Sequence, residues 1–309
     1  MRNFQVQSIP CHSLVADDGF LYLSPRSATI RVSIHLCCTV LLGAFMLWGF
    51  LAEPPVLGFF CSDTSIRYPL RAETVPSSLA TILVVGIPSI LFVVVELLYA
   101  FVADKSGLSL VPLQCCSLPK FLLDAYTTFG GFVFGLILSF SVANVAKLSI
   151  GRLRPHFLAV CQPNWEALTC SDSTGPILVE KYDCLGTDSE AIREARLSFF
   201  SAHSSNSSFA MVYTLIYLQC RIGGPPGAAG SRPFRRMLHA NKGAEWLWDV
   251  ATALRPFIQG ALLLLCFFIA FSRIYDSYHH LGDVATGLLV GTIVAFYAAF
   301  WVSRLHRFT

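Results

Sequence analysis

Charged residues are scarce in this chain. Only 13% of its 309 residues are Asp, Glu, Lys or Arg, and the formal net charge is +3. A soluble domain of this length would carry roughly twice that charged fraction. The basic residues are spread along the chain, whereas nucleic-acid binding usually needs a clustered basic face. The composition therefore argues against a soluble globular protein and against nucleic acid as a partner.

Short alternating apolar segments, the pattern of a membrane β-barrel, are also missing, because the apolar runs are continuous. Hydrophobic residues make up 54% of the chain. A spanning helix needs about 20 mostly apolar residues. We predict six such helices, the fifth of them slightly short, over residues 30–51, 79–102, 121–146, 209–218 with its flanks, 256–271 and 284–302.

The six spans predict one membrane domain over residues 30–302, with an N-terminal segment, 1–29, and a tail, 303–309. The first apolar run is too long for a removable signal peptide, and Asp17 and Asp18 precede it. Residues 222–254 form an extended loop between the fourth and fifth spans. We place both termini and this loop in the cytoplasm.

Two features indicate which side faces out. Basic residues are in modest excess in the loop around residues 221–255, in the tail and in the N-terminal segment, as expected of cytoplasmic segments, although the opposite loops also contain some. The opposite loops contain four cysteines, an even number that suits an oxidising compartment, although four free thiols are the alternative. Three pairings are open. These cysteines are Cys61, Cys161, Cys170 and Cys184.

Three polar segments lie at helix ends on the predicted outer side, at residues 147–155, 199–205 and 272–284. Lys147, Arg154 and Arg273 bring three fixed positive charges, which match phosphate oxygens. Ser201 precedes a helix start, whose free N–H groups also favour an anion. A helical bundle can bring the three segments together, and we expect an anion site there.

The same segments supply His203 and His279. Asp283 lies four residues after His279, one helical turn on, where a carboxylate can fix the tautomer of the ring. One histidine then acts as nucleophile and the other as proton donor, while the cations stabilise the transferring phosphoryl group. A metal site would want cysteine or carboxylate ligands where these motifs have arginines, so we expect no metal.

The three segments resemble the three signatures of the type 2 phosphatidic acid phosphatase superfamily, in the family's order. KLSIGRLRP (147–155) is similar to Lys, six residues and Arg-Pro; SAH (201–203) to Ser-Gly-His; and SRIYDSYHHLGD (272–283) to Ser-Arg, five residues, His, three residues and Asp. Residues 58–69 and 150–165 are similar to animal lipid phosphate phosphatases. The resemblance extends over residues 30–302.

The resemblance implies an all-α, six-helix bundle of the type 2 phosphatidic acid phosphatase and haloperoxidase-like kind. Such enzymes dephosphorylate phosphatidic acid, lysophosphatidic acid, sphingosine-1-phosphate and ceramide-1-phosphate at an outward-facing site, without magnesium or another cofactor. By position, His279 is the nucleophile, Asp283 its stabiliser and His203 the proton donor. The residues expected to bind phosphate are Lys147, Arg154, Ser201, Ala202 and Arg273.

The implied partners are phosphorylated lipids and the bilayer, and the sequence allows a homo-oligomer. We expect a multi-pass protein of the plasma membrane, with its site extracellular or lumenal.

Two departures from the family pattern stand out. Ala202 replaces the usual glycine, and if that position needs a positive φ or a close approach of phosphate, alanine costs about 1 kcal/mol or more and lowers activity. The loop of residues 222–254 is longer than usual. Its apolar residues among basic ones predict an interfacial helix; they are Phe234, Leu238, Trp246 and Leu247.

Other polar residues have alternatives to a catalytic role. His280 competes with its neighbour as nucleophile, although Asp283 is less well placed to orient it. Asp276 is interpreted as a solvated loop charge. Arg152 fits a headgroup contact and a surface residue equally well.

Polar residues within the predicted helices need a separate explanation. Glu96 and Asp124 would be functional candidates as intramembrane acids, but an interhelical hydrogen bond is the role we predict for them. Asn206 begins a glycosylation sequon, yet it sits at a helix start close to His203. We expect it to be unglycosylated.

Two functions compete with the phosphatase. One is a catalytically inactive relative that binds lipid or protein, although every signature side chain except the glycine is present. The other is a transporter or channel with an anion site, against which the lack of an internal repeat argues. Phosphate release from phosphatidic acid in EDTA distinguishes an enzyme from both.

Overall fold

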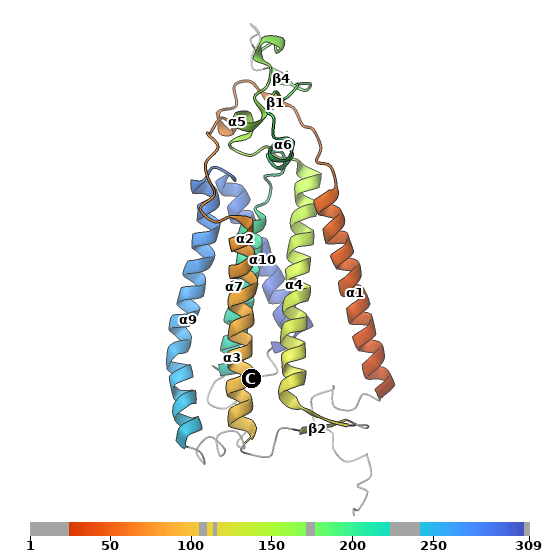
Figure 1. Ribbon diagram of the computed structural model, residues 1–309, viewed down its shortest axis with the longest axis vertical. Helices are drawn as coiled ribbons and strands as arrows, with labels where there is room; N and C mark the ends of the chain where they lie inside the picture. Colours follow the sequence, from red (N-terminus) through yellow and green to blue (C-terminus); the bar gives the residue numbers. More distant parts are fainter. Residues whose placement is uncertain (1–24, 105–109, 114–115, 171–176, 223–241, 306–309) are drawn as a thin grey trace, which may run out of the picture.

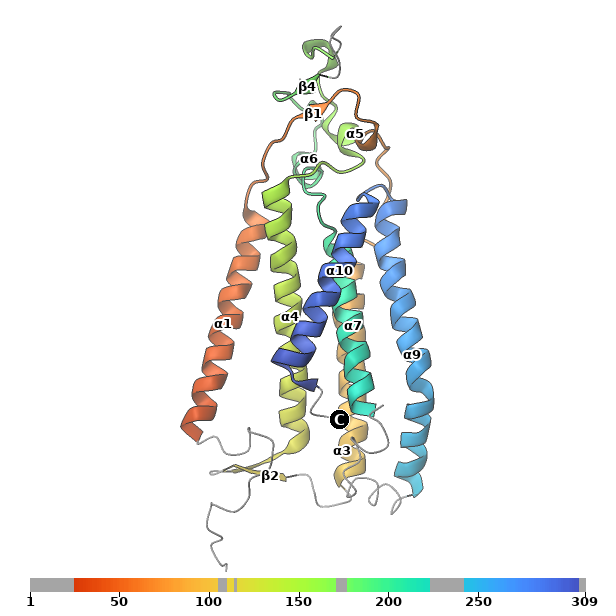
Figure 2. The same cartoon turned by 180° about the vertical axis from the view of Figure 1, so that it is seen from behind.

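The computed structural model describes residues 25–104, 110–113, 116–170, 177–222 and 242–305. Long helices stand side by side in one bundle, and loops with short elements cover one end of it (Figures 1 and 2). We call this cover the cap; it comprises the described residues of 52–76 and 151–200. The described chain starts and ends at the opposite end of the bundle (Figure 1).

The bundle consists of long helices, as predicted, because continuous apolar segments satisfy their backbone groups internally. These helices are α1 (Pro25–Leu51), α2 (Ser77–Thr81) continuing through the π-helical η2 (Ile82–Gly86) into α3 (Ile87–Asp104), α4 (Lys120–Ile150), α7 (Ala202–Ile222), α9 (Lys242–Tyr275), and α10 (Leu281–Tyr297) continuing into the π-helical η4 (Ala298–Val302). The expected all-α fold class is confirmed.

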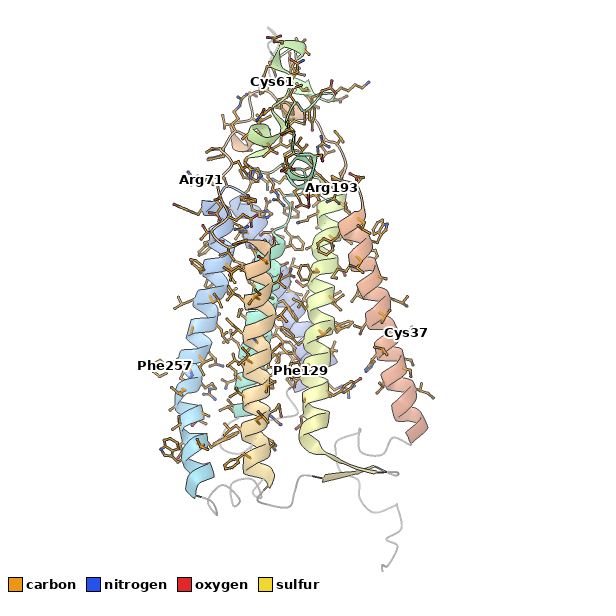
Figure 3. All side chains as sticks on the ribbon, in the orientation of Figure 1. Cys37, Cys61, Arg71, Phe129, Arg193 and Phe257 are labelled. Atoms are coloured by element: carbon orange, nitrogen blue, oxygen red, sulfur yellow. A yellow bond between two sulfur atoms is a disulfide. The ribbon has the colours of Figure 1, made fainter. Side chains whose placement is uncertain are left out.

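Five of the described helical segments are long and apolar enough to cross a membrane, namely Val32–Leu51, Ser77–Phe101, Asp124–Ile150, Glu245–Tyr275 and Leu281–Val302. Apolar side chains such as Phe257 point outward from the bundle (Figure 3). The helix α7 is not one of the five, so the six-span count stays a prediction. Its many serines are tolerated because α7 is largely buried among the other helices.

The helices α7 and α10 pack closely, and this contact matters for the site. A Cβ atom added to Gly287 of α10 would lie 2.7 Å from the carbonyl oxygen of Ser201. Ser208 of α7 also donates a hydrogen bond to the carbonyl of Leu288, at 2.8 Å. Small residues therefore let the start of α10 approach the start of α7, which brings two of the signature segments together.

Buried aromatic rings fill the centre of the bundle. Phe92 makes edge-to-face contacts with Phe132, Tyr213 and Tyr217, and Phe132 also packs on Phe209. These rings come from α3, α4 and α7. Each such pair adds about 0.5–1.5 kcal/mol beyond the burial of its area, so this cluster holds the three helices at fixed positions.

A buried ionic cluster ties the same three helices near the end away from the cap. Arg221 of α7 contacts Glu96 of α3 at 2.6 Å and Asp124 of α4 at 2.9 Å. The hydroxyl of Tyr217 donates to Glu96 at 2.8 Å. The predicted interhelical role of Glu96 and Asp124 is confirmed.

The helix α9 begins at Lys242, earlier than expected. Residues 242–254, which we assigned to an extended loop, are therefore helical. Trp246 and Leu247 belong to this long helix and not to a separate interfacial one. Phe234 and Leu238, the other residues of the predicted interfacial helix, lie outside the described residues.

The cap has a small core and two disulfides. Its elements are β1 (Phe59–Phe60) paired antiparallel with β4 (Leu178–Val179), the 3-10 turns η1 (Thr64–Ile66) and η3 (Trp165–Ala167), and the helices α5 (Phe157–Cys161) and α6 (Ser189–Glu194). Of the three open pairings, the structure has Cys61–Cys170 and Cys161–Cys184; Figure 3 marks Cys61 near the tip. A second antiparallel pair, β2 (Leu110–Leu113) and β3 (Cys116–Pro119), lies at the other end of the molecule.

Candidate active site

A cavity of about 720 Å³ lies where the cap meets the bundle. Its lining includes six of the predicted site residues, which come from α4, the loop after it, α7, the end of α9 and the loop before α10: Lys147, Arg154, Ala202, His203, Arg273 and His279. Three positive charges and two imidazoles thus face one space. The segments that carry them are far apart in the chain.

Ser201 and Ala202 occupy the start of α7. Ser201 is fully buried and does not line the cavity; its hydroxyl accepts a hydrogen bond from the backbone N–H of Ser204 at 3.4 Å. Its own N–H donates to the carbonyl of Asp283 at 3.2 Å. Ala202 lines the cavity. Among the described residues, the non-glycine residues with a positive φ are Gln162, Ser277 and Arg304, so the φ of Ala202 is negative. A positive-φ requirement therefore does not explain the family's glycine here.

His279 is buried at the cavity wall. Its Nδ1 atom lies 3.5 Å from the hydroxyl oxygen of Ser198 and 3.8 Å from Oδ2 of Asp283. Burial, the largest cause, lowers the pKa of His279 to about 3; Asp283 opposes this shift, whereas Arg154 and Lys147 add to it. The ring is therefore neutral at physiological pH, as a nucleophile must be.

Asp283 is held by more groups than the family pattern suggests. Oδ1 accepts a hydrogen bond from Arg152 at 2.7 Å, and Oδ2 accepts one from the Ser198 hydroxyl at 2.6 Å. The backbone N–H of His280 also donates to Oδ2, at 3.1 Å, in a capping box at the start of α10. The ring Nδ1 of His280 lies 3.2 Å from Oδ2, closer than that of His279, so the expectation that Asp283 is less well placed to orient His280 is wrong. Ser198 thus lies between this carboxylate and the ring of His279, and Asp283 reaches the ring mainly through it.

Arg152 and Ser198 were missed as site residues by sequence reasoning. Arg152, interpreted as a headgroup contact or a surface residue, is an ion-pair partner of Asp283. Its proximity to the first signature was the only signal. Ser198 has no signal in its spacing. Its position next to His279 depends on contacts between segments more than 80 residues apart.

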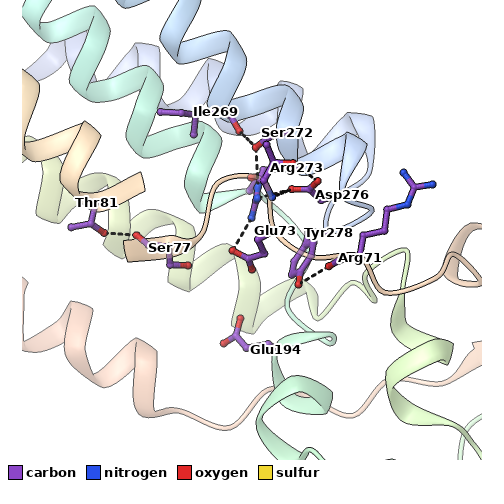
Figure 4. A network of polar contacts seen from close by, with 12 residues as sticks. Arg71, Glu73, Ser77, Thr81, Glu194, Ile269, Ser272, Arg273, Asp276 and Tyr278 are labelled. Carbon is purple, nitrogen blue, oxygen red and sulfur yellow. Dashed lines mark hydrogen bonds and ion pairs between the residues drawn. The ribbon is translucent and has the colours of Figure 1, made fainter. Parts of the chain in front are cut away.

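Arg273 pairs with two carboxylates, as Figure 4 shows. Its Nη1 atom lies 3.4 Å from Glu73, and its Nη2 atom lies 3.0 Å from Asp276. Asp276 also accepts hydrogen bonds from the N–H and the hydroxyl of Thr74, both at 2.7 Å. Its exposed fraction is 1%. The interpretation of Asp276 as a solvated loop charge is therefore wrong.

Arg154 pairs with Glu194 of α6, at 2.8 Å. Burial alone would raise the pKa of Glu194, but the charges of Lys147, Arg154 and Arg193 outweigh it and hold this pKa below its usual range. Glu194 and Glu73 both line the cavity. Each arginine of the cationic group thus has a carboxylate partner that an incoming anion can replace.

Tyr278 and His156 connect the first and third signature segments. The ring of Tyr278 lies under the guanidinium groups of Arg154 and Arg273, at 5.6 and 5.3 Å, and meets the ring of His156 edge-on. Burial lowers the pKa of His156 to about 4, so its Nδ1–H donates to the carbonyl of Ser277 at 2.8 Å. Ser277 has φ of 63°, a turn that this bond stabilises.

His203, at the first turn of α7, lines the cavity opposite the loop of His279. Its Nε2 atom is buried and has no hydrogen-bond partner among the described residues. A ring nitrogen in this state is available to a ligand. The arrangement as a whole can bind a phosphate group, attack it with one imidazole and protonate its leaving oxygen with the other.

Comparison with known proteins identifies the family. The sequence model of the PAP2 superfamily matches residues 129–307. Phospholipid phosphatase 1 of Rattus norvegicus is 33% identical over 90% of this chain and 86% of its own length. A protein named putative phosphatidate phosphatase in Drosophila melanogaster is 33% identical over 90% of this chain and 69% of its own length. Phospholipid phosphatase 2 of Mus musculus is 32% identical over 88% and 85%. No solved structure matches the chain.

Proposed function

The chain belongs to the PAP2 superfamily, and we propose on this basis that it is an integral membrane phosphatase of phosphorylated lipids. Its substrates are lipid phosphomonoesters: phosphatidic acid, lysophosphatidic acid, sphingosine-1-phosphate and ceramide-1-phosphate. One observation carries the proposal. Three buried or half-buried cations and two imidazoles face one cavity at the ends of apolar helices. The names of the relatives, phospholipid and phosphatidate phosphatases, agree with it.

The lipid phosphate enters the cavity as an anion and takes its place among Lys147, Arg154 and Arg273. In doing so it replaces Glu194 and Glu73 as counter-ions, at least in part. Arginine favours this exchange because its planar fork matches two phosphate oxygens as well as it matches a carboxylate. The exchange also leaves no guanidinium group unpaired at any stage.

In the first chemical step, Nε2 of His279 attacks phosphorus and the ester P–O bond breaks. Nδ1–H faces Ser198 and Asp283, which stabilise the positive charge that develops on the ring. The negative charge of the bound phosphate favours a proton on His203, and the protonated ring donates it to the leaving alkoxide, which departs as the lipid alcohol. The product is a phosphohistidine.

In the second step, a water molecule attacks phosphorus on the side that the lipid alcohol has left. His203, now neutral, accepts a proton from this water, and the P–N bond to His279 breaks. Inorganic phosphate leaves and both rings return to their initial state. The same three cations stabilise the charge of both transition states.

For the location we propose a multi-pass protein of the plasma membrane with the cap and the site on the extracellular or lumenal side. Two disulfides in the cap support this orientation, because such bonds persist in oxidising compartments. The excess of basic residues in the sequence around 221–255 supports a cytoplasmic position for the other end.

Phosphate release from phosphatidic acid in detergent micelles with EDTA tests the proposal. The wild-type protein should release phosphate, and His279→Ala should lower the rate by a factor on the order of 10⁴ or more, as removal of a nucleophile does. His280→Ala removes the neighbouring imidazole, which lies 3.2 Å from Asp283 but does not line the cavity, and it should keep far more activity than His279→Ala. A folded wild-type protein that binds the lipid and releases no phosphate would instead identify an inactive relative.

A further inference from the structure

The cavity continues past the cationic residues into the bundle. Its deeper lining is apolar and comes from two helical segments, with Phe140 on α4 and Val84 and Val85 in η2. A phosphate group bound to the cations would therefore leave its lipid chain directed toward this apolar part. The boundary between the two parts contains two carboxamide side chains.

These are Asn206 of α7 and Asn144 of α4, both of which line the cavity. Asn206 lies three residues after His203, and Asn144 three residues before Lys147. Since α7 runs away from the cap and α4 runs toward it (Figure 1), both lie deeper than the site residue on their own helix. Three residues of helix correspond to about 4.5 Å. Each amide thus lies about one helical turn deeper than the site residue on its own helix.

Asn206 has an unusual state for a buried amide. Its exposed fraction is 5%, and its Oδ1 atom has no hydrogen-bond partner among the described residues. A buried acceptor without a partner is unfavourable, and native proteins seldom keep one unless it has a use. Asn144 differs, because its Nδ2 donates to the carbonyl of Met46 on α1 at 3.1 Å.

We propose that Asn206, supported by Asn144, binds the polar group of the lipid backbone that follows the phosphate ester. In glycerol and sphingoid lipids a hydroxyl, ester or amide lies one or two carbons from the ester oxygen, about one helical turn from the phosphate. The amide of Asn206, once turned toward the cavity, accepts from a hydroxyl or N–H there through Oδ1 and donates to an ester oxygen there through Nδ2. This inference rests on the proposed function and names the substrates it selects: phosphate esters with a hydrogen-bonding group next to the phosphate.

The glycosylation sequon that Asn206 begins does not account for this residue. Asn206 is buried within α7, and Ser207 and Ser208 of the sequon are buried as well. Nor does helix packing account for it, since a packing role would leave the amide bonded to a neighbouring helix, as Asn144 is bonded to α1.

Two substrates of equal chain length test the proposal: a lysophosphatidic acid, which has a backbone hydroxyl and ester, and an alkyl phosphate, which has neither. Asn206→Leu should lower kcat/KM for the lysophosphatidic acid about tenfold, which is the value of one lost hydrogen bond. The rate with the alkyl phosphate should stay within about twofold. Ser207→Ala is the matched control, because Ser207 is buried on the same helix, bonds within it at 3.2 Å and does not line the cavity.

Equal losses on both substrates, or no loss on either, would overturn the proposed role of Asn206 and leave the proposed phosphatase function unaffected. A wild-type protein inert toward both substrates would overturn the proposed function itself. Asn206→Ala is the second variant if the leucine variant does not elute as a folded protein in detergent, and it should show the same selective loss. Asn144→Leu should show a smaller loss of the same kind.

Discussion

Two buried arginines in this molecule have similar partners but different surroundings. Arg221, in the bundle away from the cap, pairs with Glu96 and Asp124 at 2.6 and 2.9 Å. Arg273, at the cap end, pairs with Glu73 and Asp276 at 3.4 and 3.0 Å. Their exposed fractions are 4% and 1%, so burial does not distinguish them.

The difference lies in what else each arginine faces. Arg221 is enclosed by the ring of Tyr99, 3.8 Å away, and by partners from two other helices. Arg273 lines an open cavity, and its partner Glu73 is partly exposed. A guanidinium that is fully enclosed can only hold helices together, whereas one at a cavity can exchange its carboxylate for a phosphate. An intramembrane charge is therefore a functional candidate only where a ligand can reach it.

Of the changes that test this comparison, Arg273→Met should have the largest effect. Loss of this cation removes charge stabilisation from the transition state, and kcat/KM for phosphatidic acid should fall by about 10³-fold, or about 4 kcal/mol. Steady-state phosphate release measures the change. If Arg273→Met kept wild-type activity, the proposed distinction between the two arginines would be lost.

Arg221→Met should affect stability instead. Removal of one partner leaves Glu96 and Asp124 as buried, uncompensated groups, which costs about 3 kcal/mol. Unfolding in detergent should show this loss, while kcat/KM per folded molecule stays within about threefold of wild type. A variant with normal stability and no activity would show that the cluster belongs to the site.

The third-largest effect should come from low pH, which should destabilise the cap end. The pKa values of folded His156 and His279, about 4 and about 3, lie below the ordinary 6.5. Between pH 6.5 and these values the two histidines are protonated in the unfolded chain but not in the folded protein. The free energy of unfolding therefore falls as the pH decreases, and above pH 6.5 this effect vanishes. At pH 5 each histidine should cost about 2 kcal/mol.

Unfolding measured at pH 7 and pH 5 tests this pH dependence, and His156→Gln should remove part of the difference. An unchanged difference in this variant would mean that His156 is not the titrating group.

Ser198→Ala should have the smallest effect of the four. The hydroxyl connects Asp283 to His279 without touching substrate, so kcat should fall about tenfold while KM stays within about twofold. Ser198→Thr, which keeps the hydroxyl, should restore most of kcat. Equal changes in both variants would point to a general packing defect and not to a positioning role.

Much of the site could be predicted before any fold was known. Lys147, Arg154, His203, Arg273 and His279 were identified from three short segments and meet at one cavity. The signals that identified them are short-range: the signature residues lie within a few positions of each other at helix ends, and Asp283 follows His279 by one helical turn. The apolar runs likewise predicted most helices to within a few residues.

Other features had no local signal. Glu73 and Ser198 reach the site from loops and Glu194 from the short helix α6, and the composition of these segments is that of any polar loop. The position of each of these residues depends on a contact across the cap, so no spacing along the chain predicts it. The start of α9 at Lys242 was missed because its first turns are polar and amphipathic, a pattern that indicated a separate interfacial helix within a loop and not the beginning of a span.

The amino-acid order alone dictated a membrane bundle and the chemical groups at its helix ends, since hydropathy and short-range spacing act within one segment. Packing of distant segments decided which carboxylate each arginine meets, that Asn206 faces a cavity, and that Arg221 is enclosed while Arg273 is not. These outcomes depend on which surfaces fit together in three dimensions, because burial and ion pairing are properties of neighbours in space and not along the chain.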